Sequence, residues 1–246
     1  VEESEDEDED LEFDGFDDDS DDEYDEDMEE EEIASDEYTL VFEVDGMLAT
    51  VALMPGPVPE GEAEHNAATN YLWPEAVEET KRHVAHLVVA VLPRDNDYLQ
   101  AGQLLVKLCE TCMRDDGAIG IYTAGTVFQP AFYREAAAVM HDGELPYLNW
   151  VYFGLCQSEN GWMNGYTYGL ECFGKAEIEV LDTVANPSEL RDFLFNISAY
   201  VLSSNVTLRD GETIGFTADQ KLPITLSEGV YLDGETLKIG FKPANT

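Results

Sequence analysis

The sequence predicts an α+β protein with a mixed, largely antiparallel sheet and helices mainly on one face, preceded by a disordered acidic tail. Three observations lead to this class. A long N-terminal segment has no basic side chain, short apolar or alternating runs indicate strands, and amphipathic stretches between them indicate helices. The chain has 246 residues, of which 44% are hydrophobic, enough to bury a sizeable core.

Residues 1–37 are the predicted tail. They hold 25 of the 54 acidic residues and none of the 12 lysines and arginines, which leaves 29 acidic and 12 basic residues in 38–246. Such a segment cannot bury enough apolar surface to offset its ordering entropy, so we expect disorder. Phe13 and Phe16 interrupt the acidic run and are candidate contacts for a basic, partly apolar partner. A purely solubilising tail is the alternative.

The rest of the chain, residues 38–246, is expected to be a single α+β domain, with 38–143 and 144–246 as alternative subdomains. In its first half, β-forming residues on both sides of Asp45-Gly46 predict a hairpin. The continuous apolar run Val84 to Leu92 predicts a central strand buried on both faces. The pattern also predicts helices at 60–71, 74–82, 97–114 and 129–140, and a strand at 118–128.

The second half is predicted to be richer in strands. Pro187 and Ser188 open an amphipathic helix whose apolar residues recur at helical spacing. Asp210-Gly211 and Asp233-Gly234 indicate the turns of two closing hairpins. The pattern predicts strands at 147–156, 165–173 and 177–183, and this helix at 189–204.

Charge and composition exclude several classes of protein. Residues 38–246 are too acidic to bind nucleic-acid phosphates directly, and no apolar run approaches the length of a membrane span. No secretory signal is visible, although the chain begins with Val1 rather than Met, which leaves sequence upstream of it open. Four cysteines are too few for a disulfide framework of this size and suggest reduced thiols and the cytoplasm.

The best candidates for catalysis or metal binding are His83, His86 and Glu64. On a helix the two histidines would share a face, but at the start of a strand they point to opposite faces. One histidine satisfied in the core and one at the surface is therefore the favoured interpretation, and a hydrolase or metalloenzyme is the alternative.

Two further motifs are weak. Gly169 to Lys175 matches G-x-x-x-x-G-K of a phosphate-binding loop, but Ala176 lacks the hydroxyl for Mg²⁺ and a strand rather than a helix is predicted to follow. Cys109 and Cys112 form a CxxC late in a predicted helix, where the dipole disfavours a thiolate. We therefore expect neither a nucleotide nor a redox site, and no cofactor or metal.

An aromatic series could line a pocket or a partner groove, with core packing as the more common use. Trp162 lies beside the Asn160-Gly161 turn and is the member expected at an interface. The full series is Trp150, Tyr152, Phe153, Trp162, Tyr166, Tyr168 and Phe173.

The stretches YTYGLECFGKAEIEV, LRDFLFNISAYVL and DGETIGF resemble the C-terminal signature of a bacterial family called domain of unknown function 4261. NYLWPEAVEETKRHVAHLVVAV and LMPGPVPEGEA resemble its N-terminal half, so the resemblance extends from Tyr38 to Phe241. The resemblance implies a bacterial cytoplasmic origin but no activity and no catalytic residues.

No convergent set of catalytic residues is visible. We therefore predict an uncharacterised bacterial cytoplasmic protein that acts as a non-enzymatic protein-interaction module. Its partner is expected to be a protein, and a basic one suits the acidic tail. Neither direct nucleic-acid binding nor a membrane is expected.

Overall fold

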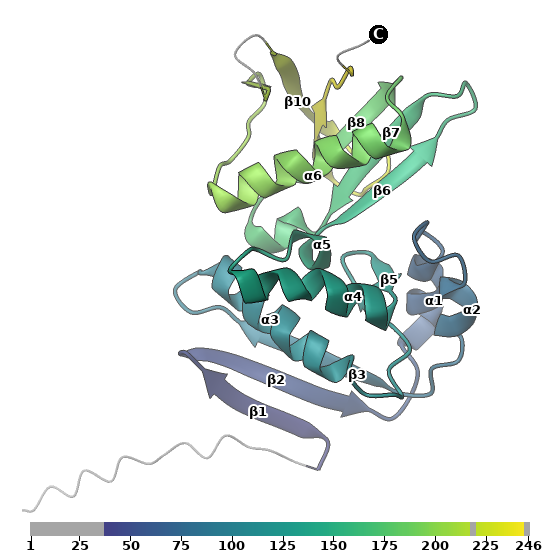
Figure 1. Cartoon of the computed structure of the whole chain (residues 1–246), viewed down its shortest axis with the longest axis vertical. Helices are drawn as coiled ribbons and strands as arrows, with labels where there is room; N and C mark the ends of the chain where they lie inside the picture. Colours follow the sequence, from purple (N-terminus) through teal and green to yellow (C-terminus); the bar gives the residue numbers. More distant parts are fainter. Residues whose placement is uncertain (1–36, 217–219, 244–246) are drawn as a thin grey trace, which may run out of the picture. The chain divides into compact units, whose positions relative to one another are not determined.

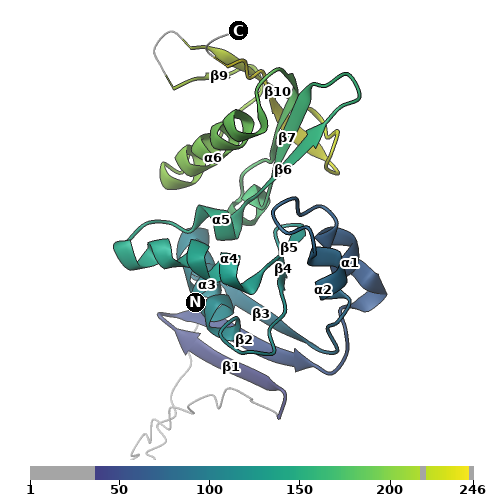
Figure 2. The ribbon, with the colours of Figure 1, turned by 45° about the vertical axis from the view of Figure 1, so that its right-hand side comes forward.

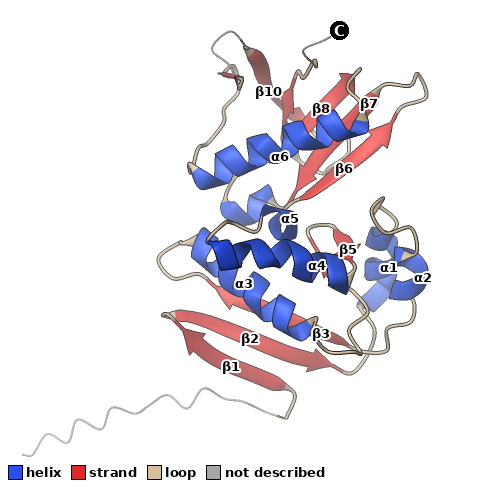
Figure 3. Ribbon diagram, in the orientation of Figure 1, coloured by secondary structure: helices blue, strands red, loops and turns tan. Residues whose placement is uncertain are grey.

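The computed structural model describes residues 37–216 and 220–243 (Figure 1). The acidic segment that contains Phe13 and Phe16 lies outside these residues. Helices and both antiparallel and parallel strand pairs make up the described part, which confirms the α+β class (Figure 3). No helix among the described residues is long and apolar enough to cross a membrane.

The predicted hairpin at the start of the body is confirmed. Strands β1 (Thr39–Val44) and β2 (Met47–Met54) pair antiparallel, and the turn residues Asp45 and Gly46 both have positive φ, 53° and 76°. Strand β3 (His86–Leu92) pairs antiparallel with β2 in the order β1-β2-β3. The prediction that this segment is a central strand is wrong, because β3 lies at the edge of its sheet and Val88 and Leu92 are exposed.

Short helices connect β2 to β3. They are shorter than predicted because Gly61 takes a positive φ of 69° just before α1, and irregular residues that include Pro74 separate α1 from α2. Trp73 packs with Ala63, Ala67 and Ala76 in a small core of their own. The elements are η1 (Pro59–Gly61), α1 (Glu62–Ala67) and α2 (Ala76–Thr80).

The long predicted helix after β3 is α3 (Tyr98–Cys112). The Asp97 side chain caps it by accepting a hydrogen bond from Gln100 N at 3.0 Å. Ala101 and Leu104 of α3 pack on Met47 and Val91, so α3 covers one face of the three-stranded sheet (Figures 1 and 2).

A small hairpin follows α3 in place of the single strand that was predicted. Ala124 and Gly125 form its turn with positive φ angles of 47° and 67°. Helix α4 begins at Pro130, as the sequence predicts, and continues as a 3-10 turn. The elements are β4 (Ile121–Thr123), β5 (Thr126–Phe128), α4 (Pro130–Ala137) and η2 (Ala138–Asp142).

The second half forms a separate six-stranded sheet in the order β6-β7-β8-β11-β10-β9, so the two halves share no sheet. Strands β8 and β11 pair parallel, and the other neighbours pair antiparallel. The elements are α5 (Tyr147–Trp150), β6 (Tyr152–Gln157), β7 (Met163–Tyr168), η3 (Leu170–Phe173), β8 (Ile178–Thr183), β9 (Thr213–Ile214), β10 (Leu222–Glu228) and β11 (Glu235–Ile239).

Three boundaries in this half differ from the predictions. Strand β7 ends at Tyr168, and Leu170–Phe173 form η3 in place of the end of the strand predicted at 165–173. Tyr147 starts a short helix rather than a strand. Asp210-Gly211 is not a hairpin turn. Instead, Gly211 N donates to Ile224 O and the Asp210 side chain accepts from Leu226 N, so this segment lies along β10.

Helix α6 (Pro187–Ser203) confirms the predicted helix and covers one face of the six-stranded sheet. Asn186 and Glu189 form a complete capping box at its start. Its apolar residues Leu190, Leu194 and Ile197 are fully buried. Gly165 of β7 allows this close approach, since a Cβ there would lie 2.9 Å from Leu194.

Candidate functional site

The strand register places two different sets of side chains on the faces of the six-stranded sheet. Directly opposed residues of an antiparallel pair share a face. Phe153 contacts Phe195 of α6, which identifies its side as the face that α6 covers. The pairs Tyr152–Tyr168 and Gly154–Tyr166 therefore lie on the face away from α6.

On that face four tyrosine rings form a row of contacts, and two further tyrosines lie beside them. We call these six the tyrosine surface. Ring centroids lie 6.1 Å apart for Tyr71 and Tyr152, 6.5 Å for Tyr152 and Tyr166, and 5.8 Å for Tyr166 and Tyr231, the last pair being stacked. Distances in this range are those of favourable aromatic pairs. The surface consists of Tyr71, Tyr122, Tyr152, Tyr166, Tyr168 and Tyr231.

Glycines make room for two of these rings. The Tyr166 ring lies over Gly154, where an added Cβ would come within 2.1 Å of it. The Tyr168 ring lies over Gly125 in the turn of the β4–β5 hairpin, where a Cβ would come within 3.0 Å. The tyrosine surface therefore follows the backbone closely and joins the six-stranded sheet to the β4–β5 hairpin.

The outer members of the tyrosine surface are open to solvent. The exposed fractions are 41% for Tyr71, 37% for Tyr122, 45% for Tyr168 and 39% for Tyr231, whereas Tyr152 is buried. The Tyr152 hydroxyl donates to the carbonyl of Thr69, which fixes the centre of the surface. At one edge, the Tyr122 hydroxyl donates to Glu62 Oε1 at 2.7 Å.

Burial raises the pKa of five of these phenols, which are already neutral at physiological pH: Tyr71, Tyr122, Tyr152, Tyr166 and Tyr231. It raises the pKa of Tyr166 to about 12, with smaller contributions from Cys156, Tyr231 and Tyr71. Burial together with the Glu62 carboxylate raises the pKa of Tyr122 to about 12. These five groups are thus hydrogen-bonding partners with apolar rings, and a raised pKa does not suit any of the five to act as a general base.

The loop that carries Tyr231 is held by a buried carboxylate. Glu179 accepts hydrogen bonds from Val230 N at 3.0 Å and Tyr231 N at 2.8 Å, and from Thr236 Oγ1 at 3.0 Å. Burial acts to raise its pKa, but these hydrogen bonds and that of Lys238 outweigh burial and hold the pKa of Glu179 below its usual value. The carboxylate is therefore a fixed anchor for the loop.

A second buried carboxylate, Glu177, explains the phosphate-loop motif. Its Oε1 accepts from Gly169 N at 2.6 Å and Glu171 N at 3.2 Å, and its Oε2 accepts from Thr167 Oγ1 at 2.6 Å. The loop amides that could bind a phosphate are thus directed at a carboxylate of the same chain. The segment after the motif is β8, a strand, as the sequence predicts.

His83 and His86 attach the proline-rich connection after β2 to the start of β3. His83 Nε2 accepts from Val58 N at 2.7 Å, so its Nδ1 carries the hydrogen and donates to Thr80 O at 2.5 Å. His86 Nδ1 donates to the Gly56 carbonyl at 2.8 Å. Both rings therefore serve backbone groups.

Among the contacts of the described residues, Glu64 lies close to His83 but not to His86. Its Oε1 lies 3.6 Å from His83 Nδ1, beyond hydrogen-bond distance, while His86 contacts Gly56 instead. Within residues 37–216 and 220–243 no three His, Cys, Asp or Glu side chains are grouped so that they could hold a metal ion. The geometry favours a structural role for the histidines.

All four cysteines are free thiols. Burial, followed by the neighbouring Cys112, raises the pKa of Cys109 to about 12, and burial raises the pKa of Cys112 as well. A CxxC with two protonated thiols is unsuited to thiolate chemistry.

A groove of about 770 Å³ lies between α3 and α4. It holds Lys107, Arg114 and Arg134, but Glu110 lies 2.9 Å from Arg114 and 3.5 Å from Arg134. The Arg114 guanidinium, in turn, holds the pKa of Glu110 below its usual value. Two of the three cations are thus already paired, which weakens the groove as an anion site.

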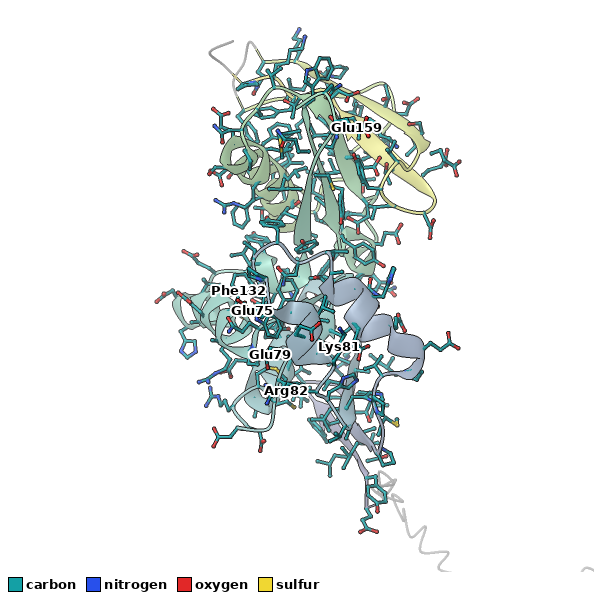
Figure 4. The ribbon with its side chains drawn as sticks, turned by 90° about the vertical axis from the view of Figure 1, so that its right-hand side faces the viewer. Glu75, Glu79, Lys81, Arg82, Phe132 and Glu159 are labelled. Carbon is teal, nitrogen blue, oxygen red and sulfur yellow. The ribbon has the colours of Figure 1, made fainter. Side chains whose placement is uncertain are left out.

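The remaining aromatic candidates divide between core and surface. Trp162 is 44% exposed in the β6–β7 turn, whose place Glu159 marks in Figure 4. Trp150 and Phe153 are buried, and Phe173 packs on Trp150 with ring centroids 4.8 Å apart. The sequence series thus contains three members of the tyrosine surface, Tyr152, Tyr166 and Tyr168. It misses Tyr71, Tyr122 and Tyr231, because only the tertiary fold brings them there.

In a comparison with family models, residues 166–240 match the family described as domain of unknown function DUF4261. The matched segment includes Tyr166, Tyr168 and Tyr231 of the tyrosine surface and both buried carboxylates, Glu177 and Glu179. Comparisons with curated proteins and with solved structures give no match. The predicted resemblance to this family is confirmed over residues 166–240, which match its model.

Proposed function

We propose that this protein is a non-enzymatic protein-interaction module that binds a protein partner through the tyrosine surface. The observation that carries the proposal is a row of four tyrosine rings in contact, with Tyr168 and Tyr122 next to each other beside it. Four of the six tyrosines are 37–45% exposed. Tyrosine is enriched at protein interfaces because its ring supplies contact area at low entropic cost and its hydroxyl can bond to the partner.

The charge of the chain supports a basic partner. The formal net charge is -42, and residues 38–246 alone hold 29 acidic and 12 basic residues. Complementary charge accelerates encounter and selects partners, and the same field repels nucleic acid. Four free cysteines suit the cytoplasm, and we include a bacterial cytoplasmic setting in the proposal.

The alternative of a hydrolase or metalloenzyme at His83, His86 and Glu64 has less support. Each histidine already bonds to the backbone of the connection after β2, and His83 uses both ring nitrogens. A ligand or substrate would have to displace these hydrogen bonds.

Pull-down from a native lysate with three forms of the full chain tests the proposal. The surface variant is Tyr168→Ala/Tyr231→Ala, and the matched control is Tyr98→Ala/Tyr200→Ala, whose side chains are 42% and 46% exposed outside the tyrosine surface. We expect the wild type and the control to retain the same protein and the surface variant to lose it. Equal retention by all three forms, or retention of no protein by the wild type, contradicts the proposal.

A further inference from the structure

The three-stranded sheet has one covered and one uncovered face. Opposed residues share a face, so Ala49 and Val91 lie on the side of α3 together with Met47. The neighbouring positions point the other way. Apolar side chains dominate there, and we call this side the open face: Val41, Leu48, Met54, Val88, Ala90 and Leu92.

The open face is exposed and almost free of charge. Leu48 and Val88 are each 42% exposed, Met54 is 39% exposed and Leu92 is 61% exposed. Among the strand residues on this side, only Glu43 carries a formal charge at pH 7 when histidine is neutral. In Figures 1 and 2 no helix or strand of the described part lies on the side of this sheet away from α3. Contiguous apolar surface of this kind marks interaction sites.

The sequence of β3 is that of a strand buried on both faces. From His86 to Leu92 its two alternating sets of side chains are both apolar apart from His86, a pattern found where both faces are covered. As an edge strand it also lacks the lysine, proline or bulge that protects exposed edges. Its sequence therefore indicates a second covering layer beyond α3.

The dimensions of the open face suit one helix. Three strands spaced about 4.8 Å apart, with about 3.3 Å per residue over seven residues, give a face of roughly 14 by 23 Å. A helix is about 10 Å wide and a 15-residue helix is about 22 Å long. Helix α3, which has 15 residues, covers the centre of the opposite face, where Met47 and Ala49 are buried, while Leu40, Leu53 and Leu87 at its margins remain exposed.

A second copy of this chain fits the open face less well. The difference between the two occupants lies in their charge. Each copy would bring 29 acidic and 12 basic residues in 38–246. Repulsion between two acidic bodies opposes this contact, and the same charge attracts a basic partner.

We infer that the open face binds an amphipathic helix of another protein. The apolar stripe of that helix would lie against Leu48, Val88 and Leu92, and lysines or arginines on its outer side would match the acidic chain. With the partner helix in place, the sheet would be the middle of three layers, between this helix and α3. The open face is separate from the tyrosine surface, so the proposal of binding at either surface can be contradicted without affecting the other.

Two fluorescently labelled 15-residue peptides of identical leucine and lysine composition test the inference with the full chain. One has leucine at i, i+3, i+4 and i+7, and the other is scrambled so that no stripe forms. Fluorescence anisotropy measures both affinities at about 0.15 M salt, where charge–charge attraction is screened as at physiological ionic strength. We expect the striped peptide to bind about tenfold more tightly, a difference of about 1.4 kcal/mol.

The decisive variant is Leu48→Gln/Leu92→Gln. Its matched control is Leu226→Gln/Val230→Gln, because Leu226 is 41% and Val230 is 61% exposed outside the open face. The first should abolish the preference for the striped peptide and the second should keep it. Circular dichroism checks folding, and Val88→Thr, which is nearly isosteric, should weaken the same preference if the double variant does not fold.

Three outcomes would overturn the inference. The peptides could bind equally to the wild type, which would show charge attraction alone. The preference could survive Leu48→Gln/Leu92→Gln in folded protein, which would place the peptide elsewhere. Sedimentation could also show a wild-type dimer that this variant dissociates, and the occupant would then be a second copy.

Discussion

The Glu179 carboxylate and the Lys238 ammonium lie 3.2 Å apart across the parallel pair of β8 and β11. Glu179 is completely buried, and the Lys238 side chain is only 15% exposed. Lys238 also donates to the carbonyls of Ser227 and Glu228 at 2.9 and 2.6 Å. This ion pair therefore links β8, β11 and the end of β10, and it fixes the loop that positions Tyr231.

Glu179→Gln should lower the free energy of unfolding by about 3 kcal/mol at pH 7, because Lys238 would lose a buried partner. The pKa of Glu179 is lower in the folded protein than its usual value. The carboxylate thus stabilises the fold above about pH 4.3, and this contribution is lost as the pH falls through the folded pKa. Urea titrations at several pH values should show wild type and variant converging below about pH 4.

Glu235→Gln is the control for this prediction. Glu235 is exposed in β11, the strand that contains Lys238, and lies opposite Glu228, a like-charge pair. Removing one charge should leave stability unchanged or raise it slightly. A loss in Glu235→Gln as large as in Glu179→Gln would contradict the role given to the ion pair.

Gly154→Ala should disturb the tyrosine surface without removing a tyrosine. The new Cβ would lie 2.1 Å from the Tyr166 ring, so the ring must leave its stack with Tyr231. We expect weaker partner binding and a loss of about 1–3 kcal/mol of stability from overpacking. Gly56→Ala is the control, since no atom lies within 4 Å of its Cβ position. Near-ultraviolet circular dichroism and pull-down should change only in Gly154→Ala.

Asn186→Ala should lower the stability of the protein by about 1 kcal/mol, since it removes the capping box of α6. For a chain of this size the melting temperature should fall by about 2–4 °C. Asn196→Ala, at an exposed position within the same helix, should act in the opposite direction because alanine has the higher helix propensity. Thermal melts that show equal losses for both variants would refute the capping role.

Iodoacetamide at pH 8 should label Cys172 first and leave Cys109 unmodified in the folded protein. Cys172 is exposed, whereas Cys109 is buried with a pKa of about 12, so about one Cys109 thiol in ten thousand is ionised at this pH. Mass spectrometry of the labelled peptides gives the order. Modification of both cysteines at one rate without denaturant would show that the CxxC is reactive.

Elements whose position depends only on neighbouring residues were predicted correctly from local signals such as turn and helix-start residues. The turn at Asp45-Gly46 and the start of α6 at Pro187 depend on nearby backbone geometry and are found where expected. The position of β3 was predicted wrongly because an apolar run indicates burial without saying what provides it. Ala124 was also missed, because a non-glycine residue with positive φ gives little warning of a turn.

The tyrosine surface was predictable only in part, because a local pattern connects some of its members and the tertiary fold brings in the others. Tyr166 and Tyr168 alternate along one strand, and Tyr152 lies opposite on the next, so the sequence could indicate half of the tyrosine surface. Tyr71 and Tyr231 reach it from segments that no local pattern connects. The Glu177 side chain likewise turns back on the loop before it, a contact that a motif match cannot show.

The Glu177 carboxylate occupies two amides of the loop at residues 169–174, as a competing ligand for a phosphate would. A ligand on the same chain competes at an effective concentration of millimolar or more, whatever the supply of free anions in the cell. Since the carboxylate already bonds to Gly169 N and Glu171 N, a phosphate could reach these two amides only by expelling a buried acid. The motif at residues 169–175 therefore resembles a nucleotide site in sequence only. In the fold, its loop makes an internal contact with Glu177.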